Sequence, residues 1–131
     1  MTREKLGDER YVNLATFRKT GREVRTPVWV VSEGERLCVY TNVTSGKVKR
    51  IRNDGRVLLA PCDARGRLRG DWVEGQARML DDPEAVERGL AAIERKYGWQ
   101  MRLALFASRL TGRYAQRGVI EIRVPPPGAC S

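Results

Sequence analysis

The residues of this sequence that could do chemistry gather where an expected strand passes into a short helix. The segment 40–54 reads YTNVTSGKVKRIRND, and Lys47, Lys49 and Arg50 fall in the first turns of that helix. A helix N-terminus already carries about half a positive charge, so cations are disfavoured there unless an anion shares the site. The alternative is a solvated basic helix face, the common fate of charge runs. The spacing favours a phosphate pocket.

Composition excludes most other kinds of catalytic site. The chain has no histidine in 131 residues, which removes Ser–His and Cys–His nucleophile pairs, histidine bases and most zinc or haem sites. Its three cysteines, Cys38, Cys62 and Cys130, lack metal-ligand spacing, and the first two lie in apolar runs typical of buried strands. We expect no metal site, and chemistry that comes from a cofactor or from carboxylates.

The positive charge is concentrated in the first half of the chain. The formal net charge is +9, of which residues 1–70, with 16 basic and 8 acidic side chains, contribute +8. Nucleic acid and a multiply charged small cofactor are the two partners that such an excess favours. The chain has few aromatic residues, nine in all, and several stand at core-like positions, which argues against single-strand nucleic-acid binding.

The length of the sequence and its apolar runs indicate how many domains to expect and whether a membrane segment is expected. The size is that of one domain, 1–131, with a core over residues 11–124 and a loose proline-rich tail over 125–131. The first ten residues are too charged for a signal peptide, and no apolar run approaches the roughly 18 residues of a membrane span. We expect a cytoplasmic protein with no membrane segment and reduced cysteines.

Hydrophobic patterning predicts a mainly β chain. Six strands are expected, at Tyr11–Arg18, Arg22–Val31, Arg36–Thr41, Arg56–Cys62, Asp71–Leu80 and Gly118–Val124. Residues that alternate along three of these strands share a face: Val24, Thr26, Val28 and Val30; Leu37 and Val39; and Val73, Gly75, Ala77 and Met79. The small residues of the last set indicate close packing. A helix is expected with its N-cap in Asp81–Asp82, Pro83 in its first turn and Gly98 as its C-cap, and with Val86, Leu90, Ile93 and Tyr97 on one face. A second helical stripe comprises Trp99, Leu103, Phe106 and Leu110. Short strands with hairpin connections indicate a closed or nearly closed antiparallel barrel, because closure removes exposed strand edges.

These elements occur together with a set of short motifs. The motifs are VNLATF at 12–17, TPVW at 26–29, YTN at 40–42 and SGKVKR at 45–50 ahead of DGRV at 54–57. In this order they resemble the pyridoxamine-phosphate-oxidase-like split β-barrel proteins, and most of all the branch of deazaflavin (F-420) dependent oxidoreductases. The resemblance runs from Tyr11 to Val124. It implies a homodimer with the flavin or deazaflavin in a cleft at the dimer interface and its phosphate at the strand–helix corner.

The resemblance also implies which residues hold the cofactor. Ser45, Lys47, Lys49 and Arg50 would hold the phosphate and the acidic tail, and Thr41 and Asn42 would line the corner. Arg25, Thr26, Pro27, Val28 and Trp29 match the strand beside the ring, where backbone amides would bind the polar edge of the ring. A proline in mid-strand must lie at an edge or a bulge, which suits a ligand approaching the backbone. Trp29 fits a barrel-core aromatic equally well.

The function implied is hydride transfer between a deazaflavin and an unsaturated or conjugated small molecule, with no catalytic side chain assigned. The missing histidine is a departure from the vitamin B6 oxidases, so oxidation of that vitamin is not expected. Two alternatives remain: an FMN-binding oxidoreductase of the same fold, and a nonenzymatic barrel that binds flavin, deazaflavin or haem. FMN has one phosphate and needs fewer cations, so the local excess of charge favours the more acidic coenzyme F-420.

Overall fold

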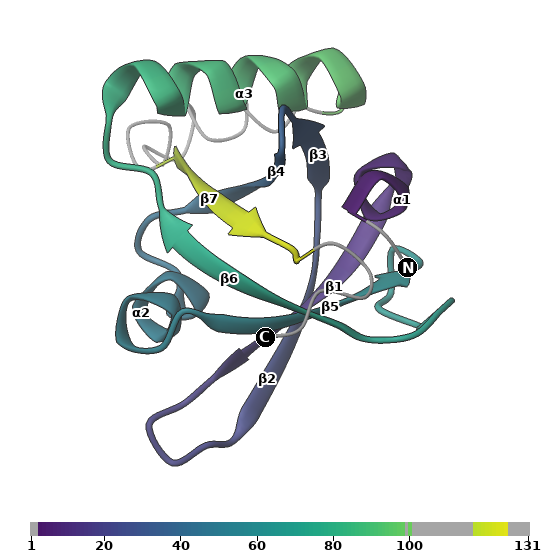
Figure 1. Ribbon diagram of the computed structural model, residues 1–131, viewed down its shortest axis with the longest axis vertical. Coiled ribbons are helices and arrows are strands. Elements are labelled where there is room, and N and C mark those ends of the chain that lie inside the picture. The colour runs from purple at the N-terminus through teal and green to yellow at the C-terminus, as the bar shows by residue number, and fades with distance from the viewer. Residues whose placement is uncertain (1–2, 99, 101–116, 126–131) are drawn as a thin grey trace.

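One antiparallel sheet forms the framework of the molecule (Figure 1). A computed structural model describes residues 3–98, 100 and 117–125 of the chain. The strands are β1 (Tyr11–Phe17), β2 (Glu23–Val28), β3 (Val30–Glu33), β4 (Arg36–Asn42), β5 (Arg56–Cys62), β6 (Val73–Met79) and β7 (Arg117–Arg123). The helices are α1 (Arg3–Asp8), α2 (Gly46–Asn53) and α3 (Pro83–Tyr97). Within these described ranges the strand order is β2-β1-β5-β6-β7-β4-β3, and the fold is mainly β, as the sequence predicts.

The sheet closes into a barrel because its two outermost strands are consecutive in the chain. β2 ends at Val28 and β3 begins at Val30, so the two strands are halves of one extended segment that is interrupted at Trp29. The first half pairs with β1 and the second half pairs with β4. The sequence predicts this segment as a single strand, Arg22–Val31, which is why it predicts six strands where the described residues form seven.

The interruption at Trp29 has a cause in its neighbours. Pro27 has no N–H to give to a ladder. The Val30 N–H donates to the Tyr97 hydroxyl of α3 at 2.9 Å, so it too is diverted from strand pairing. The chain therefore leaves β1 at this point and continues beside β4. Because Tyr97 is 67 residues away from Val30, this break depends on tertiary structure as well as on the local proline.

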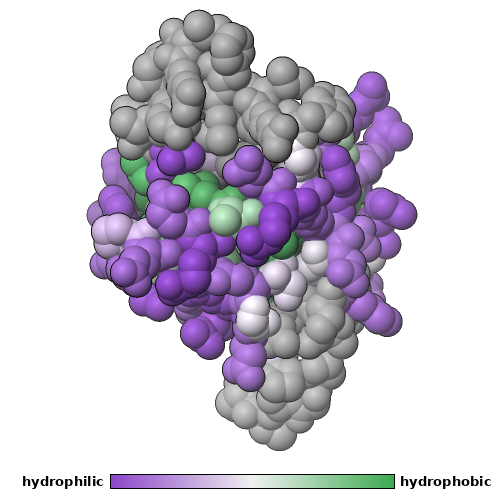
Figure 2. Space-filling model, turned by 90° about the horizontal axis from the view of Figure 1, so that it is seen from above, coloured by the Kyte–Doolittle hydropathy of each residue, from purple (hydrophilic) through white to green (hydrophobic). Residues whose placement is uncertain are grey.

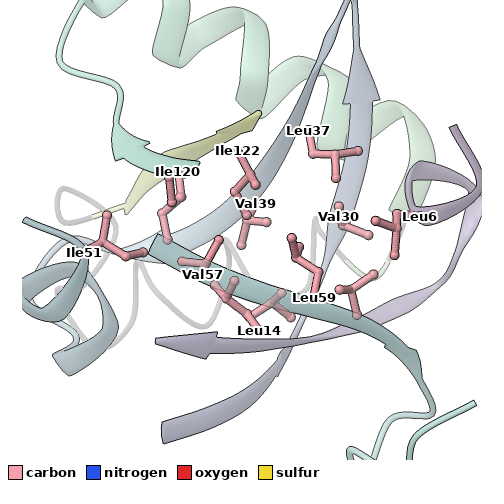
Figure 3. Close-up of a cluster of buried hydrophobic side chains, with 13 residues drawn as sticks. Leu6, Leu14, Val30, Leu37, Val39, Ile51, Val57, Leu59, Ile120 and Ile122 are labelled. Carbon is pink, nitrogen blue, oxygen red and sulfur yellow. The ribbon is translucent and has the colours of Figure 1, made fainter. Parts of the chain in front are cut away.

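The interior of the barrel holds the main hydrophobic cluster. Side chains from β1, β3, β4, β5 and β7 point toward one another there, as Figure 3 shows for Leu14, Val30, Val39, Leu59 and Ile120. The predicted period-two patterns are confirmed: Val28 and Val30 of one segment, Leu37 and Val39 of β4, and Ala77 of β6 all face this interior. Gly75 is confirmed as a point of close packing, since a Cβ there would lie 3.0 Å from the Ile122 Cγ2.

A second cluster fills the space between the sheet and α3. It contains Cys38, Val119 and, from the helix, Leu90, Ile93 and Tyr97, with Trp29 and Tyr40 packed against it. Cys38 lies between Leu37 and Val39 in sequence, so alternate residues of β4 serve the two clusters, one on each face of the sheet. Cys38 and Cys62 are both buried, as predicted, and burial raises the pKa of their thiols to about 12 and about 11.

The ends of α3 match the sequence prediction. Asp82 is the N-cap, its side chain accepts a hydrogen bond from the Glu84 N–H, and Pro83 opens the first turn. The chain leaves the helix at Gly98, whose φ of 56° favours glycine. The second predicted stripe, Trp99 to Leu110, the tail residues 126–131 and Cys130 lie outside the described residues.

Helix α1 was not expected from the sequence. It has six residues, and its Leu6 is fully buried in the barrel cluster. The Lys96 ammonium of α3 donates to the carbonyl oxygens of Gly7, Glu9 and Val30 at 2.7, 2.5 and 2.6 Å. The bonds to Gly7 and Glu9 satisfy carbonyl groups at and just after the C-terminal end of α1, which a short helix leaves without partners. The helix is therefore fixed by α3 and the barrel and not by its own sequence pattern.

The surface seen from the side of α3 is mostly hydrophilic where described residues form it (Figure 2). Leu68 is 44% exposed and is the one large hydrophobic side chain among the described residues that is exposed. Within the same residues, no helix has both the length and the apolar character that crossing a membrane requires. Apolar side chains of this part of the chain are concentrated in the two interior clusters.

Candidate functional site

The corner between β4 and α2 is built by hydrogen bonds among small polar residues. The Asn42 side-chain oxygen accepts from the backbone N–H and the hydroxyl of Thr44, at 2.9 and 2.7 Å. The Ser45 N–H donates to the Asn42 carbonyl at 3.0 Å, and the hydroxyl oxygens of Thr41 and Ser45 are 3.3 Å apart. Thr41 is 2% exposed. The corner that the sequence assigns to Thr41, Asn42 and Ser45 is thus one connected turn.

The first turn of α2 presents backbone N–H groups without an acidic side chain beside them. Ser45 occupies the N-cap position in an extended conformation, but its side chain forms no capping hydrogen bond. No Asp or Glu stands in the first turn of this helix. The N–H groups at the start of a helix have no partner within the helix, and together with the helix dipole they attract anions.

Two of the predicted cations lie together over this first turn. Arg50 folds back along the helix, so that a Cβ on Gly46 would lie 2.8 Å from the Arg50 Nη1. The Arg50 Nε donates a 2.6 Å hydrogen bond to the Thr16 hydroxyl of β1. Lys47 is one helical turn before Arg50 and half-buried. The helix therefore brings Lys47 and Arg50 to one place between α2 and β1.

The positive charges at this place are not neutralised by the described residues. Neither Lys47, Arg50 nor Arg18 of the β1–β2 hairpin forms an ion pair with a described carboxylate. Burial and the charge of Arg50 lower the pKa of Lys47, and burial and the charge of Arg18 lower the pKa of Arg50. Burial and the neighbouring cation both disfavour the charged forms of these two side chains. A bound anion would offset the repulsion between the cations and so raise both pKa values.

Lys49 is separated from the other two predicted cations. It is exposed, and it follows Lys47 by two positions, which places it about 200° around the helix axis from Lys47. Lys47 and Arg50, three positions apart, are on the same side of α2. The structure therefore brings together Ser45, Lys47 and Arg50 and leaves Lys49 on another face of the helix.

The second predicted group, residues 25–29, lies on and just beyond β2. This strand is at one end of the pairing order, so Pro27 lies on an edge strand, as its missing N–H requires. Arg25 and Pro27 are exposed, while Thr26 and Val28 face the barrel opposite Leu14 and Val12. One edge of this segment is open to hydrogen bonding because β2 pairs only with β1.

The side chains of Arg25 and Trp29 have partners of their own. The Arg25 guanidinium lies 4.8 Å from the centre of the Trp72 ring and forms a 2.8 Å ion pair with Glu23. The Trp29 ring stacks on Tyr97, with centroids 4.8 Å apart and an angle of 14°. Trp29 thus packs between the sheet and α3, in the second hydrophobic cluster.

Strand β1 connects the two groups. Thr16 accepts the hydrogen bond from Arg50 and stands opposite Val24, the residue before Arg25. Thr16 belongs to this site and Arg18 borders it, although sequence reasoning selected neither residue. Their spacing of two residues is visible in the sequence, but their nearness to α2 depends on the packing of β1 against that helix.

A hollow lies beside this site, between the β1–β2 hairpin and the end of α2. It has a volume of about 400 Å³ and is lined by Phe17, Arg18, Lys19, Gly21, Asn53 and Asp54. The hairpin is fixed by hydrogen bonds from the Arg18 N–H to the Arg22 carbonyl and from the Gly21 N–H to the Arg18 carbonyl, at 2.9 and 2.8 Å. Lys47, Arg50 and Arg18 are called the cationic group below, and of these three residues Arg18 lines the hollow.

Comparisons with known proteins bear on both the fold and the family. The family model described as pyridoxamine 5'-phosphate oxidase matches residues 2–124. A conserved hypothetical protein of Mycobacterium tuberculosis has a similar structure, with a TM-score of 0.69 at 22% identity over 95% of this chain and 81% of that one. A heme storage protein of Vibrio cholerae gives 0.67 at 13% identity, over 92% and 84%.

A third solved structure, described as an F420 reductase, gives a TM-score of 0.53 at 21% identity, over 93% of this chain and 92% of that one. At such low identities these three likenesses show the shared fold only. No curated protein matches the sequence.

Proposed function

The chain belongs to the pyridoxamine 5'-phosphate oxidase family, and from this membership we propose that it is an oxidoreductase that uses the deazaflavin coenzyme F-420. Its substrate would be an unsaturated or conjugated small molecule. The observation that carries the proposal is the pair Lys47 and Arg50, which share a partly buried place at the start of α2 with no described carboxylate to neutralise them.

This place fits an anionic group. The open N–H groups of the first turn and the two cations all point to the binding of a negatively charged oxygen. The hydroxyls of Thr41 and Ser45, 3.3 Å apart, add two further hydrogen-bonding groups at the same corner. Because such an arrangement has an energetic cost in the absence of an anion, it is better explained by phosphate binding than by a solvated basic face.

The ring would lie along the open edge of β2. Residues Arg25 to Trp29 contribute backbone groups on an edge that no described strand covers. Pro27 and the neighbouring loop residue Gly66 are close together, because a Cβ on Gly66 would lie 3.9 Å from the Pro27 ring, so this loop bounds one part of the edge. We assign to these residues the binding and orientation of the ring.

When bound, the coenzyme supplies the capacity to exchange a hydride with the substrate. The protein's own part is to bind the phosphate, orient the ring and exclude water, and no side chain is proposed as a catalytic acid or base. The proposal includes a homodimer with the cofactor cleft at the interface. Sedimentation of the purified protein tests this part: a dimer at micromolar concentration is expected, and a monomer would contradict it.

FMN binding is a second candidate, and one observation favours it. The cations that the structure brings together are confined to one corner, while Lys49 lies on another face of α2. A single phosphate would satisfy such a corner, whereas the longer acidic tail of F-420 requires donors spread along a groove.

The test is a fluorescence titration of the purified apo protein with F-420 and, in parallel, with FMN at matched ionic strength. Saturable binding that is tighter for F-420 is expected and would justify a screen of unsaturated substrates with reduced coenzyme. Tighter binding of FMN would replace the first candidate by the second. If neither coenzyme binds at micromolar concentration, both candidates fail.

A further inference from the structure

The hairpin residue Arg18 stands outside the motif that the family resemblance selects, yet it borders the same cationic place. We propose that Arg18 is a third cation of the anion site and makes this site select ligands by their number of negative charges. The inference rests on the proposed function for the identity of the coenzyme, but the anion site itself is testable without one.

The position of Arg18 follows from strand geometry. Thr16 is the last residue but one of β1 and Arg18 is the first residue after the strand, and residues two apart project to the same side where the chain is extended. Thr16 is the residue that receives the 2.6 Å hydrogen bond from Arg50. Two backbone hydrogen bonds of the hairpin fix Arg18. Its N–H donates to the Arg22 carbonyl at 2.9 Å, and its carbonyl accepts from the Gly21 N–H at 2.8 Å. Arg18 therefore projects beside the Arg50 side chain from a fixed backbone.

The charges of this group act on one another. The charge of Arg18 is one cause of the lowered pKa of Arg50, and the charge of Arg50 is one cause of the lowered pKa of Lys47. The three side chains thus form a chain of neighbouring cations that runs from the helix to the hairpin. None of them forms an ion pair within the part of the chain that the structure describes. An anion with more than one negative charge would relieve both repulsions.

The hollow beyond Arg18 gives such an anion room. Its volume of about 400 Å³ lies on the hairpin side of the cationic group, with Lys19 on its wall. Asp54 on the opposite wall directs its side chain to the Arg56 N–H at 3.1 Å, so that carboxylate is engaged by its own turn. A ligand that extends past the first phosphate into this hollow would therefore lie beside Arg18, whose exposed side chain forms part of the wall.

The experiment compares wild type with Arg18→Gln, Arg18→Lys and a control of equal charge change, Arg65→Gln. Arg65 is exposed and follows the far end of β5, a strand of seven residues that spans about 23 Å. Two readouts are used: the rise in melting temperature caused by pyrophosphate, and the affinities for FMN and for riboflavin, which has the same ring without the phosphate. Circular dichroism checks that each variant is folded.

In Arg18→Gln we expect the melting-temperature rise with pyrophosphate to be lost and the FMN dissociation constant to increase about tenfold, with riboflavin binding unchanged. Arg65→Gln should match wild type, and Arg18→Lys should keep most of the affinity because it keeps the charge. Wild-type behaviour of Arg18→Gln with both pyrophosphate and FMN would overturn the inference.

The two proposals fail in distinguishable ways. If wild type binds neither F-420 nor FMN, but pyrophosphate raises the melting temperature of wild type and Arg65→Gln and not of Arg18→Gln, the coenzyme proposal is wrong and the inference about Arg18 stands. If wild type binds a coenzyme and Arg18→Gln binds it equally well, the coenzyme proposal stands and the inference about Arg18 is wrong. No effect of pyrophosphate on wild type, together with no coenzyme binding, overturns both.

Discussion

The Arg50 side chain of α2 donates a 2.6 Å hydrogen bond to the hydroxyl of Thr16, a residue of β1 that is 34 positions earlier in the chain. Thr16 is 1% exposed, so this bond lies at the boundary between the barrel and the helix. The acceptor, the Thr16 hydroxyl, is neutral, so the hydrogen bond fixes the Arg50 guanidinium without neutralising its charge. The contact is therefore suited to orienting Arg50 toward an anion without neutralising it.

Replacement of Thr16 by valine removes the acceptor while keeping the shape of the side chain. We expect the affinity for the phosphate-bearing coenzyme to fall by several-fold, because Arg50 loses the bond that orients it, and stability to fall by about 1 kcal/mol. Titration with coenzyme and urea denaturation measure the two effects. Thr16→Ser keeps the hydroxyl and should restore affinity, whereas equal loss in both variants would mean that packing and not the hydrogen bond matters.

The parts of this site that lie within one short segment of the chain could be predicted from the sequence. Ser45, Lys47 and Arg50 belong to one helix, and a period of 3.6 residues places the last two on one side. The turn formed by Asn42 and Thr44 is likewise a matter of neighbouring residues. Thr16 and Arg18 could not be identified in this way, because their place in the site depends on how β1 packs against α2.

The same division holds for the fold. The alternation of Leu37 with Val39 and the apolar run of β5 were sufficient to predict buried strands, since each pattern is contained in its own segment. The bend at Trp29 and helix α1 were not predicted. The first depends on the hydroxyl of Tyr97, and the second on the ammonium of Lys96, both of which are more than 60 residues away in sequence.

Reversal of charge at Lys47 tests the corner directly. Lys47→Glu should weaken coenzyme binding by about 1.5 to 3 kcal/mol or more, since it removes a charge-assisted hydrogen bond and adds repulsion. The comparison variant is Lys49→Glu, whose side chain lies on another face of α2. A loss of F-420 affinity in Lys49→Glu with FMN affinity unchanged would indicate that the acidic tail passes this face. Unchanged affinity in a folded Lys47→Glu would remove Lys47 from the site.

Close packing of α3 on the sheet is concentrated at Gly89. A Cβ there would lie 2.9 Å from the Val119 Cγ1 of β7, and Val119 is fully buried. Alanine gains about 1 kcal/mol over glycine in a helix, but overpacking costs about 1 to 3 kcal/mol. We expect Gly89→Ala to lower the free energy of unfolding in urea by about 1 kcal/mol.

A double mutant separates the two contributions at this position. Val119→Ala makes room for the new methyl group, so Gly89→Ala should be neutral or stabilising when Val119→Ala is already present. Strictly additive effects of the two substitutions would show that the loss in Gly89→Ala does not arise at this contact.

The last prediction concerns the stability of the barrel at low pH. Glu121 of β7 is 2% exposed and accepts hydrogen bonds from Arg36 at 2.7 Å and from Arg78 and Arg123 at 3.1 Å each. Burial raises the pKa of Glu121, but the hydrogen bonds from these three arginines outweigh it and lower the pKa to about 2. In the unfolded chain the group titrates near its ordinary value of 4.5.

The sign of the effect follows from this difference. A carboxyl group with a lowered pKa contributes stability above its unfolded value, and the contribution is lost as the pH falls from about 4.5 to about 2. Glu121→Gln should therefore be less stable than wild type at neutral pH, and the difference should shrink as the pH falls through this window. Urea denaturation of both proteins from neutral pH to about pH 3 measures it.

Glu74→Gln is the matched control, because Glu74 forms an ion pair with Arg56 at 2.6 Å but its side chain is 58% exposed. An exposed pair contributes little to stability, so this variant should follow the wild-type curve at every pH. If Glu121→Gln and Glu74→Gln show the same dependence on pH, Glu121 does not have the strongly lowered pKa that its three arginines give it. A constant difference between Glu121→Gln and wild type over the whole range would assign its loss to packing rather than to charge.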